Sequence, residues 1–244
     1  MLLPTEKSKP TKKWLDQKIL VLGPGKIGKS ELFSQGDKTL FIETEPGLGH
    51  LSVMKVPVRS WEDFREVCGE LYKADAAGKF PYDTLVIDTL DKLLDRACEE
   101  VIGLGKKKFS KIADSINTIG DIPNGAGWAW VNTLMSNALD KITEFPCAIV
   151  LITHLSTRRI NDGNREYDKE TVSLFKGMAE SVIHWADHTL HFKAYMKGDR
   201  IRRVIRTKPT ESMEAGSRGM IVPDGFELNG SSAESYSKLR SLFE

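Results

Sequence analysis

Eight residues near the start of the chain have the types and the spacing of a nucleotide-phosphate site. The stretch 23–30 fits the pattern G-x-x-x-x-G-K-[ST], and an apolar run, 18–22, leads into it. A glycine-rich turn between a strand and a helix leaves backbone N–H groups free to hold phosphate oxygens. The alternative is an ordinary Gly/Pro loop. The predicted site consists of Gly23, Pro24, Gly25, Lys26, Ile27, Gly28, Lys29, Ser30 and the following Glu31.

Three side chains give this site its chemistry. In the pattern, Lys29 reaches the β- and γ-phosphates, and the Ser30 hydroxyl is a ligand of Mg²⁺. A second metal ligand is expected from Asp88, which ends the apolar run 82–88 in the manner of a Walker B strand. Thr89 then either contacts the γ-phosphate side or caps the next helix. The sequence therefore predicts ATP and Mg²⁺ as cofactors.

Two glutamates end another predicted strand, 38–45. In a parallel α/β sheet, ligands bind at the carboxyl ends of the strands, so Glu43 and Glu45 fall on the edge where the phosphate loop lies. Because side chains alternate along a strand, residues two apart point to the same side. One of the two can face the γ-phosphate and polarise an attacking water; the alternative is a solvated turn. The residues alone do not choose between the two glutamates.

A histidine closes a third apolar run, 148–154. His154 falls on the same edge of the predicted sheet, where the γ-phosphate is expected. We interpret it as a group that senses the nucleotide, against the alternative of a structural histidine. The polar segment 155–176 follows directly and is expected to change its order when the nucleotide changes.

Basic residues gather in two stretches that show no clear period. The stretch 103–127 carries a lysine run with Trp128 and Trp130 just after it, and the segment 155–176 carries several arginines. Lysines on phosphates and rings for stacking suit single-stranded nucleic acid. The alternative is a solvated lysine run with tryptophans packed in the core. The predicted DNA-binding residues are Lys106, Lys107, Lys108, Lys111, Arg158, Arg159, Arg165 and Lys176.

The order of the elements predicts an α/β fold. Its sheet is mainly parallel, flanked by helices, and ends in an antiparallel hairpin of strands at 186–192 and 200–207. Arg206 and Lys208 stand at the end of this hairpin and are interpreted as cations that reach a neighbouring subunit's phosphate. Helices are expected at 31–33, from Ser60, at 90–102 and at about 131–143. The predicted regions are a basic arm (1–17), mobile or docked on a neighbour, a core (18–230) and a helical tail (231–244).

The composition is that of an ordinary water-soluble protein. Of 244 residues, 40% are hydrophobic and 28% are charged, which suits one large domain with a buried core. The net charge of +1 predicts no nucleic-acid partner by itself, so such a surface depends on local clustering. The three cysteines form no C-x-x-C pair, and no signal peptide or apolar span of about 20 residues is visible. We therefore expect a cytoplasmic protein without membrane contact.

These motifs resemble the RecA-type recombinase core, and most closely the compact phage-encoded RecA-like ATPases that anneal single strands (Sak-type). The resemblance covers about 19–219, and its fold is a RecA-like P-loop NTPase. The run 41–45 stands where the family carries its acidic strand end, which selects Glu45 as the residue that activates water. His154 stands where the family has a glutamine that couples the γ-phosphate to a DNA loop. Arg206 and Lys208 resemble the cations that the family inserts into the neighbouring ATP site.

The resemblance implies an ATP- and Mg²⁺-dependent recombinase or annealing protein that binds single-stranded DNA. It would hydrolyse ATP between subunits of a filament or ring, in a bacterial host cytoplasm if a phage encodes it. Single-stranded DNA and further copies of the chain are the implied partners, with a single-strand-binding protein as one candidate. The implied catalytic residues are Lys29, Glu45, His154, Arg206 and Lys208. The rival hypotheses are a small-molecule or nucleotide kinase and a nucleotide-dependent scaffold in a phage replication or packaging complex.

Overall fold

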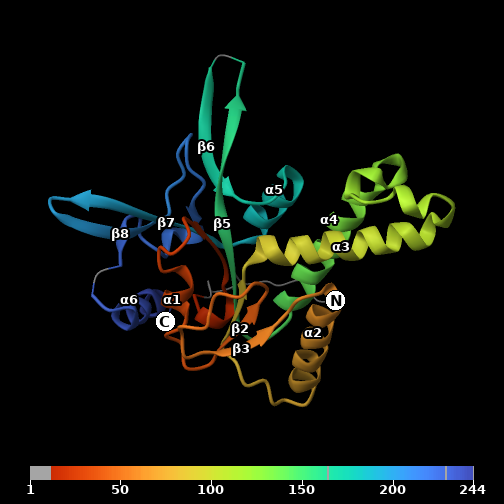
Figure 1. Cartoon of the computed structure of the whole chain (residues 1–244). Coiled ribbons are helices and arrows are strands. Elements are labelled where there is room, and N and C mark those ends of the chain that lie inside the picture. Colours follow the sequence, from red (N-terminus) through yellow and green to blue (C-terminus); the bar gives the residue numbers. More distant parts are fainter. Residues whose placement is uncertain (1–11, 164, 229, 244) are drawn as a thin grey trace, which may run out of the picture.

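A twisted sheet with helices on both faces organises the molecule (Figure 1). The computed structural model describes residues 12–163, 165–228 and 230–243, so most of the predicted basic arm, residues 1–11, lies outside it. Within the described residues the main path of the sheet has the strand order β10-β8-β7-β1-β5-β4-β2-β3, and β6 and β9 pair at its side. This arrangement confirms the predicted α/β class.

In the order of the sheet, the six neighbouring strands β7-β1-β5-β4-β2-β3 are parallel, and antiparallel strands pair beside them. The parallel strands are β1 (Lys18–Gly23), β2 (Thr39–Glu43), β3 (Met54–Pro57), β4 (Thr84–Asp88), β5 (Ala148–Asn161) and β7 (His188–Lys197). Antiparallel pairing adds β6 (Glu166–Val172), β8 (Arg200–Arg206), β9 (Gly216–Ser217) and β10 (Phe226–Glu227). The hairpin of β7 and β8 confirms the predicted C-terminal antiparallel hairpin.

Alternation along the buried strands divides the core into two layers. On β1, Leu20 and Leu22 face one layer, and Ile19 and Val21 face the other. The first layer is covered by α2 (Trp61–Ala76), α3 (Leu90–Lys108), α4 (Ala126–Thr143) and α5 (Lys176–Trp185). The second is covered by α1 (Lys29–Phe33) and α6 (Ser232–Arg240). Because the helices cover both faces, the ligand-binding edge of the sheet stays open at the carboxyl ends of the strands.

The stretch 103–127 is more regular than predicted. Instead of ending at Ile102, α3 continues to Lys108, and three 3₁₀ turns then lead to α4, which begins at Ala126 rather than near Val131. Glycines in this stretch suggest a break, but Gly105 is a point of close packing: a Cβ there would lie 2.9 Å from Ile122 Cδ1. The end of α3 and the start of α4 thus form a helical arm that projects from the domain (Figure 1).

The polar segment 155–176 is also ordered differently from the prediction. The strand β5 runs on past the core, and β6 pairs with it to form an antiparallel hairpin that projects from the sheet (Figure 1). At Lys176 the chain enters α5. Backbone pairing between β5 and β6 thus gives this polar segment a regular structure, and its expected change of order with the nucleotide stays a prediction.

Both described ends of the chain pack onto the core. Trp14, which the prediction placed in the arm, is 4% exposed and meets Tyr236 and Phe243 edge-on. Its indole N–H donates to the Thr84 hydroxyl over 2.8 Å. The predicted tail helix is present as α6, and its Tyr236 and Leu239 belong to the second core layer. In the described part of the chain, no helix is long and apolar enough to cross a membrane.

Candidate nucleotide site

The predicted phosphate loop joins β1 to α1 at the open edge of the sheet. Gly23 ends β1 beside β7, where a Cβ would lie 2.9 Å from Phe192 Cβ and from its carbonyl oxygen. Gly28 is the N-cap of α1 and has a φ of 100°, in the left-handed region that favours glycine. At Gly23 the neighbouring strand leaves no room for a side chain, and at Gly28 the backbone conformation favours glycine. The loop therefore has the shape that the motif predicts.

Lys29 points back into the loop. Its Nζ donates to the carbonyl oxygens of Gly23 and Pro24 over 2.8 and 2.9 Å, and the residue is 7% exposed. Burial lowers the pKa of Lys29, and the nearby carboxylates, Asp88 first, oppose this shift. A cation held among carbonyl oxygens at the start of a helix is suited to phosphate binding.

The two predicted metal ligands lie in direct contact. Ser30 Oγ donates to Asp88 Oδ2 over 2.6 Å, which brings α1 and the end of β4 together. Burial raises the pKa of Asp88, and the hydrogen bond from Ser30 opposes this. Thr89, next in the chain, is the N-cap residue of α3, as one of its two predicted roles has it, but its side chain makes no capping hydrogen bond. The Thr89 Oγ1 atom is buried without a hydrogen-bond partner among the described residues.

These oxygens fit Mg²⁺ bound together with nucleotide phosphates. Mg²⁺ prefers oxygen ligands and usually takes one or two from the protein and the rest from phosphates and water. Ser30 and Asp88 would hold it. Among the described residues, no group of three or more His, Cys, Asp and Glu side chains could hold a metal alone. The orphan hydroxyl of Thr89 adds a polar group at the same edge, which a phosphate oxygen could satisfy.

Glu43 and Glu45 lie in different surroundings, contrary to the prediction that they share one side of a strand. Because β2 ends at Glu43, the chain turns before Glu45 and the alternation no longer applies. Glu43 is 5% exposed and accepts hydrogen bonds from Lys55 and Arg59 over 3.0 and 3.2 Å. Although burial raises it, hydrogen bonds led by that from Lys55 lower the pKa of Glu43 overall. Only Glu45 lines the cleft beside the phosphate loop.

His154 reaches the same cleft and is held by a residue that the sequence does not mark. Its Nδ1 lies 2.8 Å from Oδ2 of Asp91, and its backbone N–H donates to Asp91 Oδ1 over 3.2 Å. Its Nε2 lies 3.7 Å from Glu45 Oε1. Asp91 is in the first turn of α3, 63 positions away in the chain. An aspartate in a first helical turn usually interacts only with the helix end, so no local signal points to this pair.

The cleft has a volume of about 630 Å³ and gathers most of the predicted site. From the loop, Gly25, Lys26, Gly28, Lys29, Ser30 and Glu31 line it, together with Glu45, Asp88, Thr89 and His154. Ile27 turns into the core instead, and Gly23 and Pro24 serve through the carbonyls that hold Lys29. Leu48 and His50 also line the cleft and are missing from the prediction. They follow the acidic strand end in a loop without a periodic pattern.

Arg203 of β8 supports the phosphate loop from the side. Its Nη1 donates to the Ile27 carbonyl over 3.4 Å and lies 3.9 Å from Glu31 Oε2. A Cβ on Gly28 would come within 2.6 Å of the same nitrogen. The hydrogen bond to Ile27 joins residues 176 positions apart, and the sequence pattern does not single out this arginine.

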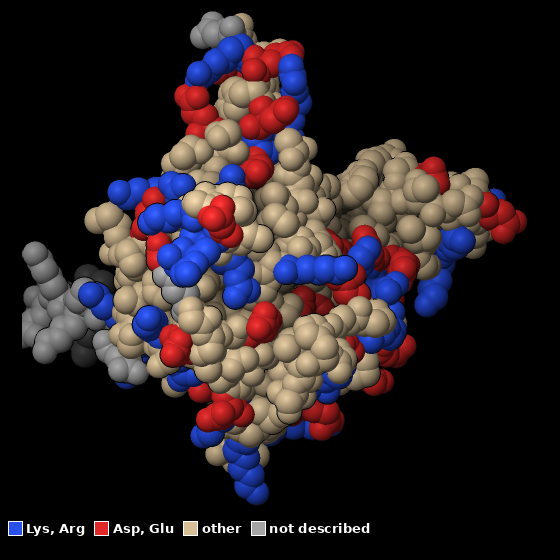
Figure 2. Space-filling model, turned by 60° about the vertical axis from the view of Figure 1, so that its left-hand side comes forward, with Lys and Arg blue, Asp and Glu red and all other residues tan. Residues whose placement is uncertain are grey.

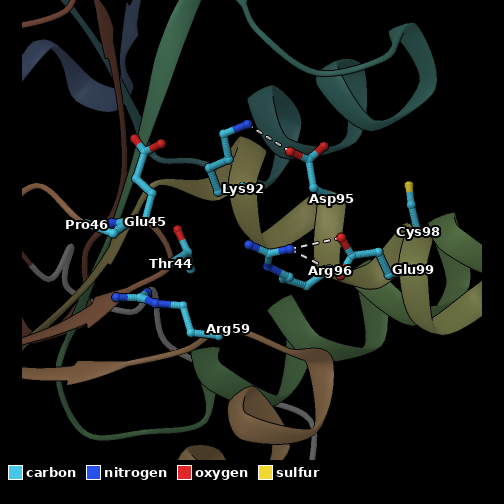
Figure 3. Close-up of a pocket in the computed structure, with 9 residues that line it drawn as sticks. All are labelled: Thr44, Glu45, Pro46, Arg59, Lys92, Asp95, Arg96, Cys98 and Glu99. Carbon is cyan, nitrogen blue, oxygen red and sulfur yellow. Dashed lines mark hydrogen bonds and ion pairs between the residues drawn. The ribbon is translucent and has the colours of Figure 1, made fainter.

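A second cleft of about 580 Å³ meets the first at Glu45 (Figure 3). Its charged side chains come mostly from α3, where Lys92 pairs with Asp95 and Arg96 pairs with Glu99. In Figure 3 these pairs line one side of the cleft, and Glu45 stands opposite them. Glu45 is therefore reachable from two directions.

The side chain of Arg206 and the backbone of Lys208 are bound within their own chain. Arg206 forms a two-pronged pair with Asp224, with both distances 3.0 Å, and the same carboxylate accepts the backbone N–H of Thr207 and Lys208. Hydrogen bonding from Arg206 is the main reason that the pKa of Asp224 falls to about 2. Neither cation lines the cleft of its own chain among the described residues. Their predicted action on a neighbour stays a prediction.

Most of the predicted DNA-binding residues lie on or near two projections, and Lys176 lies at the start of α5. Lys106, Lys107 and Lys108 are exposed in the last turn of α3, and Lys111 is exposed in the following 3₁₀ turn, all on the helical arm. Lys108 Nζ lies 4.7 Å from the Trp130 ring centroid. Lys176 is exposed at the first position of α5.

The arginines lie on or near the β5–β6 hairpin and have partners there. Arg158 donates to the Leu174 carbonyl, Arg159 pairs with Glu166 and Asp168, and Arg165 pairs with Asp162 and Glu211. In Figure 2 the hairpin projects upward and carries basic and acidic side chains interleaved. Its charge is thus balanced locally, unlike that of the lysine run on the arm.

A comparison with protein families decides the class of the chain. A family model described as an AAA domain matches residues 15–219, from the turn before β1 to the end of the C-terminal hairpin region. The chain belongs to this family. The match spans the phosphate loop and the strands that carry Asp88 and His154, so this AAA domain is a P-loop protein.

The relatives of this AAA domain add little about its activity. Its sequence is 25% identical over 202 residues to the SPbeta prophage-derived uncharacterized protein YorG of Bacillus subtilis (strain 168). That match covers 80% of the chain but 56% of YorG, so the chain spans just over half the length of this relative.

Two solved structures are similar in shape. The crystal structure of the RadB recombinase matches with a TM-score of 0.47 and 12% identity, over 87% of this chain and 85% of that one. The flagellar accessory protein FlaH from Methanocaldococcus jannaschii matches with a TM-score of 0.37 and 10% identity, over 78% and 77%. At these scores neither structure bears on activity, and the family model carries the assignment.

Proposed function

We propose that this AAA domain is an Mg²⁺-dependent ATPase whose active site is the cleft between the phosphate loop and the ends of β2, β4 and β5. The observation that carries the proposal is the convergence of Lys29, the Ser30–Asp88 contact and Glu45 on one cleft. Bound Mg²⁺ would neutralise charge on the β- and γ-phosphates. Lys29 binds the same phosphates, Ser30 and Asp88 hold the cation, and Glu45 takes a proton from the attacking water.

We further propose that the site works between subunits. Among the described residues, Arg206 and Lys208 do not line the cleft of their own chain, and in the proposal they act on the phosphates of a neighbouring copy. Cations that arrive with a neighbour stabilise developing phosphate charge only in the assembled state. Hydrolysis then depends on assembly into a ring or filament. The proposal requires Arg206 to break at least one of its two hydrogen bonds to Asp224, because the guanidinium cannot bind that carboxylate through both nitrogens and also reach a phosphate.

The proposed ligand of the assembly is single-stranded DNA, and the proposed role is recombination or annealing of the Sak type. The support comes from the helical arm, where Lys106, Lys107, Lys108 and Lys111 are exposed and Lys108 lies over Trp130. Exposed cations beside an aromatic ring suit a strand whose bases are unpaired. The hairpin arginines are the weaker part of this surface, because each one already has a partner in its own chain.

The experiment measures ATP turnover with and without single-stranded DNA. The proposal predicts turnover that DNA stimulates and that rises with protein concentration, and Lys29→Ala should abolish it. Phosphate transfer to a small acceptor would support the kinase hypothesis instead. Nucleotide binding without turnover, with or without DNA, would support the scaffold.

The DNA contact has its own test. In a titration of oligo-dT at several salt concentrations, substituting Lys106, Lys107 and Lys108 with alanine should weaken binding and flatten the plot of log K against log[salt] by about 2, at roughly 0.7 per phosphate contact. The matched control replaces the exposed Lys38, Lys73 and Lys79, which lie just before β2, on α2 and in the loop after α2, outside the arm. An equal change in slope for both triple variants would refute the arm as the DNA surface.

The prophage relative fits a phage-encoded protein that acts in the cytoplasm of a bacterial host, and we propose this location. A single-strand-binding protein is one candidate partner there, since annealing proteins must gain access to coated strands. Co-purification with such a protein from infected cells, lost on nuclease treatment, would indicate a DNA-mediated link rather than a direct one.

A further inference from the structure

Three side chains from three elements form a line that ends in the nucleotide cleft. Asp91 comes from the first turn of α3, His154 from β5, and Glu45 from the turn after β2. Asp91 Oδ2 lies 2.8 Å from His154 Nδ1, and His154 Nε2 lies 3.7 Å from Glu45 Oε1. The side chain of Asp91 is 14% exposed, whereas those of His154 and Glu45 are 40% and 34% exposed. The line therefore runs from a shielded carboxylate outward to the cleft.

The carboxylate of Asp91 sets the tautomer of the ring. A carboxylate only accepts hydrogen bonds, so the Nδ1 atom beside Asp91 must carry the hydrogen. A neutral His154 then presents an unprotonated Nε2 toward Glu45. The other Asp91 oxygen accepts the backbone N–H of His154, and this second bond keeps the carboxylate from turning away. An aspartate that orients a histidine through Nδ1 is a recurring device in proton transfer.

If Glu45 serves as the base, another group must then accept the proton from Glu45. Once it has taken a proton from water, it is neutral and must lose that proton before the next turnover. The Nε2 atom of His154 is a basic atom 3.7 Å from Glu45 Oε1, slightly beyond direct hydrogen-bond length. Such distances shorten in the complex with substrate. Asp88 and Lys29 also line the cleft, but both already have partners. Asp88 accepts the hydrogen bond from Ser30, and Lys29 donates to the loop carbonyls and is attracted by Asp88.

We propose that Asp91 is a positioning residue, which holds His154 ready to take from Glu45 the proton of the attacking water. The step rests on the proposed ATPase function. Water loses a proton to a Glu45 oxygen as its own oxygen bonds to the γ-phosphorus, and the bond from that phosphorus to the bridging oxygen breaks, releasing ADP. Glu45 then passes the proton to His154 Nε2. The imidazolium is stabilised by Asp91 and releases the proton to solvent from its exposed side.

A structural role for Asp91 is the competing explanation. Its bond to the backbone N–H of His154 fastens β5 to α3, and losing that bond could disturb the cleft without any proton transfer. The two roles differ in one respect. The backbone N–H remains when His154 is replaced by alanine, whereas the ring does not. A purely structural Asp91 therefore matters in both backgrounds, and a positioning Asp91 matters only when the ring is present.

The main experiment compares Asp91→Asn with Asp140→Asn in steady-state ATP hydrolysis. Asp140 is exposed on α4 and lines neither cleft, so it is the matched control. We expect Asp91→Asn to lower kcat on the order of 10²-fold, the lower range for general acid–base catalysis, with KM and ADP affinity unchanged. Asp140→Asn should behave as wild type. Asp91→Asn with wild-type kcat, or with a loss confined to KM and ADP affinity, overturns the relay.

Two further measurements separate the roles. In the His154→Ala background, adding Asp91→Asn should lower kcat no further, and an additional loss of similar size would mean that Asp91 is structural. In ¹⁵N spectra of the uncomplexed protein at alkaline pH, His154 should be the Nδ1–H tautomer, and Asp91→Asn should convert it to Nε2–H. A wild-type Nε2–H tautomer overturns the inference independently of turnover. If wild type does not hydrolyse ATP, the proposed function and the relay fail together, whereas unchanged turnover in Asp91→Asn overturns the relay alone.

Discussion

His188 should make the stability of this protein sensitive to mild acid. The residue is 1% exposed at the start of β7, with Nδ1 3.0 Å from Ser217 Oγ and Nε2 3.0 Å from Gln17 Oε1. The Gln17 amide nitrogen donates to the Lys13 carbonyl, which leaves its oxygen as an acceptor, so His188 Nε2 carries the hydrogen. The neutral ring thus satisfies both partners. Burial lowers the pKa of His188 to about 4 from its ordinary 6.5.

The size and sign of the effect follow from these two pKa values. The unfolded chain binds a proton at His188 as the pH falls through 6.5, whereas the folded chain binds it only near pH 4. Between those values the unfolded state holds more protons, so the free energy of unfolding decreases as the pH falls. From pH 7.5 to 5.0, His188 alone should lower it by about 2 kcal/mol, at about 1.4 kcal/mol per pH unit below 6.5.

Urea unfolding of wild type and His188→Gln at pH 7.5 and pH 5.0 measures this contribution. Other groups also titrate in this range. The informative quantity is therefore the decrease in the free energy of unfolding from pH 7.5 to 5.0, compared between the two proteins. Wild type should lose about 2 kcal/mol more than His188→Gln. His184→Gln, at an exposed position on α5, is the matched control and should lose as much as wild type. Equal losses in wild type and His188→Gln would refute the reasoning, because the folded ring would then accept a proton without penalty.

The remaining predictions concern the cleft. Glu45→Gln should keep ADP affinity and lower the rate of single-turnover hydrolysis at least 100-fold, the range expected for a lost general base. Glu43→Gln should instead lower the unfolding temperature and leave most of the hydrolysis rate intact, because the partners of Glu43 are Lys55 and Arg59. The opposite pattern would make Glu43 the base. Arg206→Ala combined with Lys208→Ala should bind ADP but fail to turn over ATP, and an equal mixture with the Lys29→Ala chain should regain about a quarter of wild-type turnover, since each chain supplies the half-site that the other lacks. A mixture without activity would refute sharing between subunits.

Much of the fold could be predicted because buried parallel strands leave a clear pattern. Each of the runs that end at Gly23, Asp88 and His154 is apolar along its buried length, and the helices between them bury one face. The missed strand β3 is an exposed edge strand with no buried residue, so it carries no such pattern. The outer half of β5 alternates only between partly buried and exposed residues, because the hairpin lies beyond the core. Backbone pairing there leaves little trace in side-chain type.

The candidate site divides in the same way. Lys29, Ser30 and Asp88 could be placed together from the sequence, since a parallel sheet brings the carboxyl ends of its strands to one edge. The residues alone did not choose between Glu43 and Glu45, because that choice depends on the residue at which β2 ends and strand ends are poorly marked in sequence. The family resemblance made the choice of Glu45. Asp91 could not be found, because its importance comes from facing His154 across 63 positions of chain rather than from any local pattern.

One continuous strand connects the nucleotide cleft to the projecting hairpin. His154 pairs with Gly23 at the start of the phosphate loop, and from the next residue, Leu155, the same strand pairs with β6. A segment that is hydrogen-bonded along its length cannot couple two sites by becoming ordered, as a free loop can. It can couple them only by tilting as a unit about its base. Arg158 donates to the Leu174 carbonyl just before α5, so we expect a displacement at His154 to move the hairpin and the start of α5 together. Within the proposed function, ATP would therefore control DNA contact there through the position of a rigid hairpin.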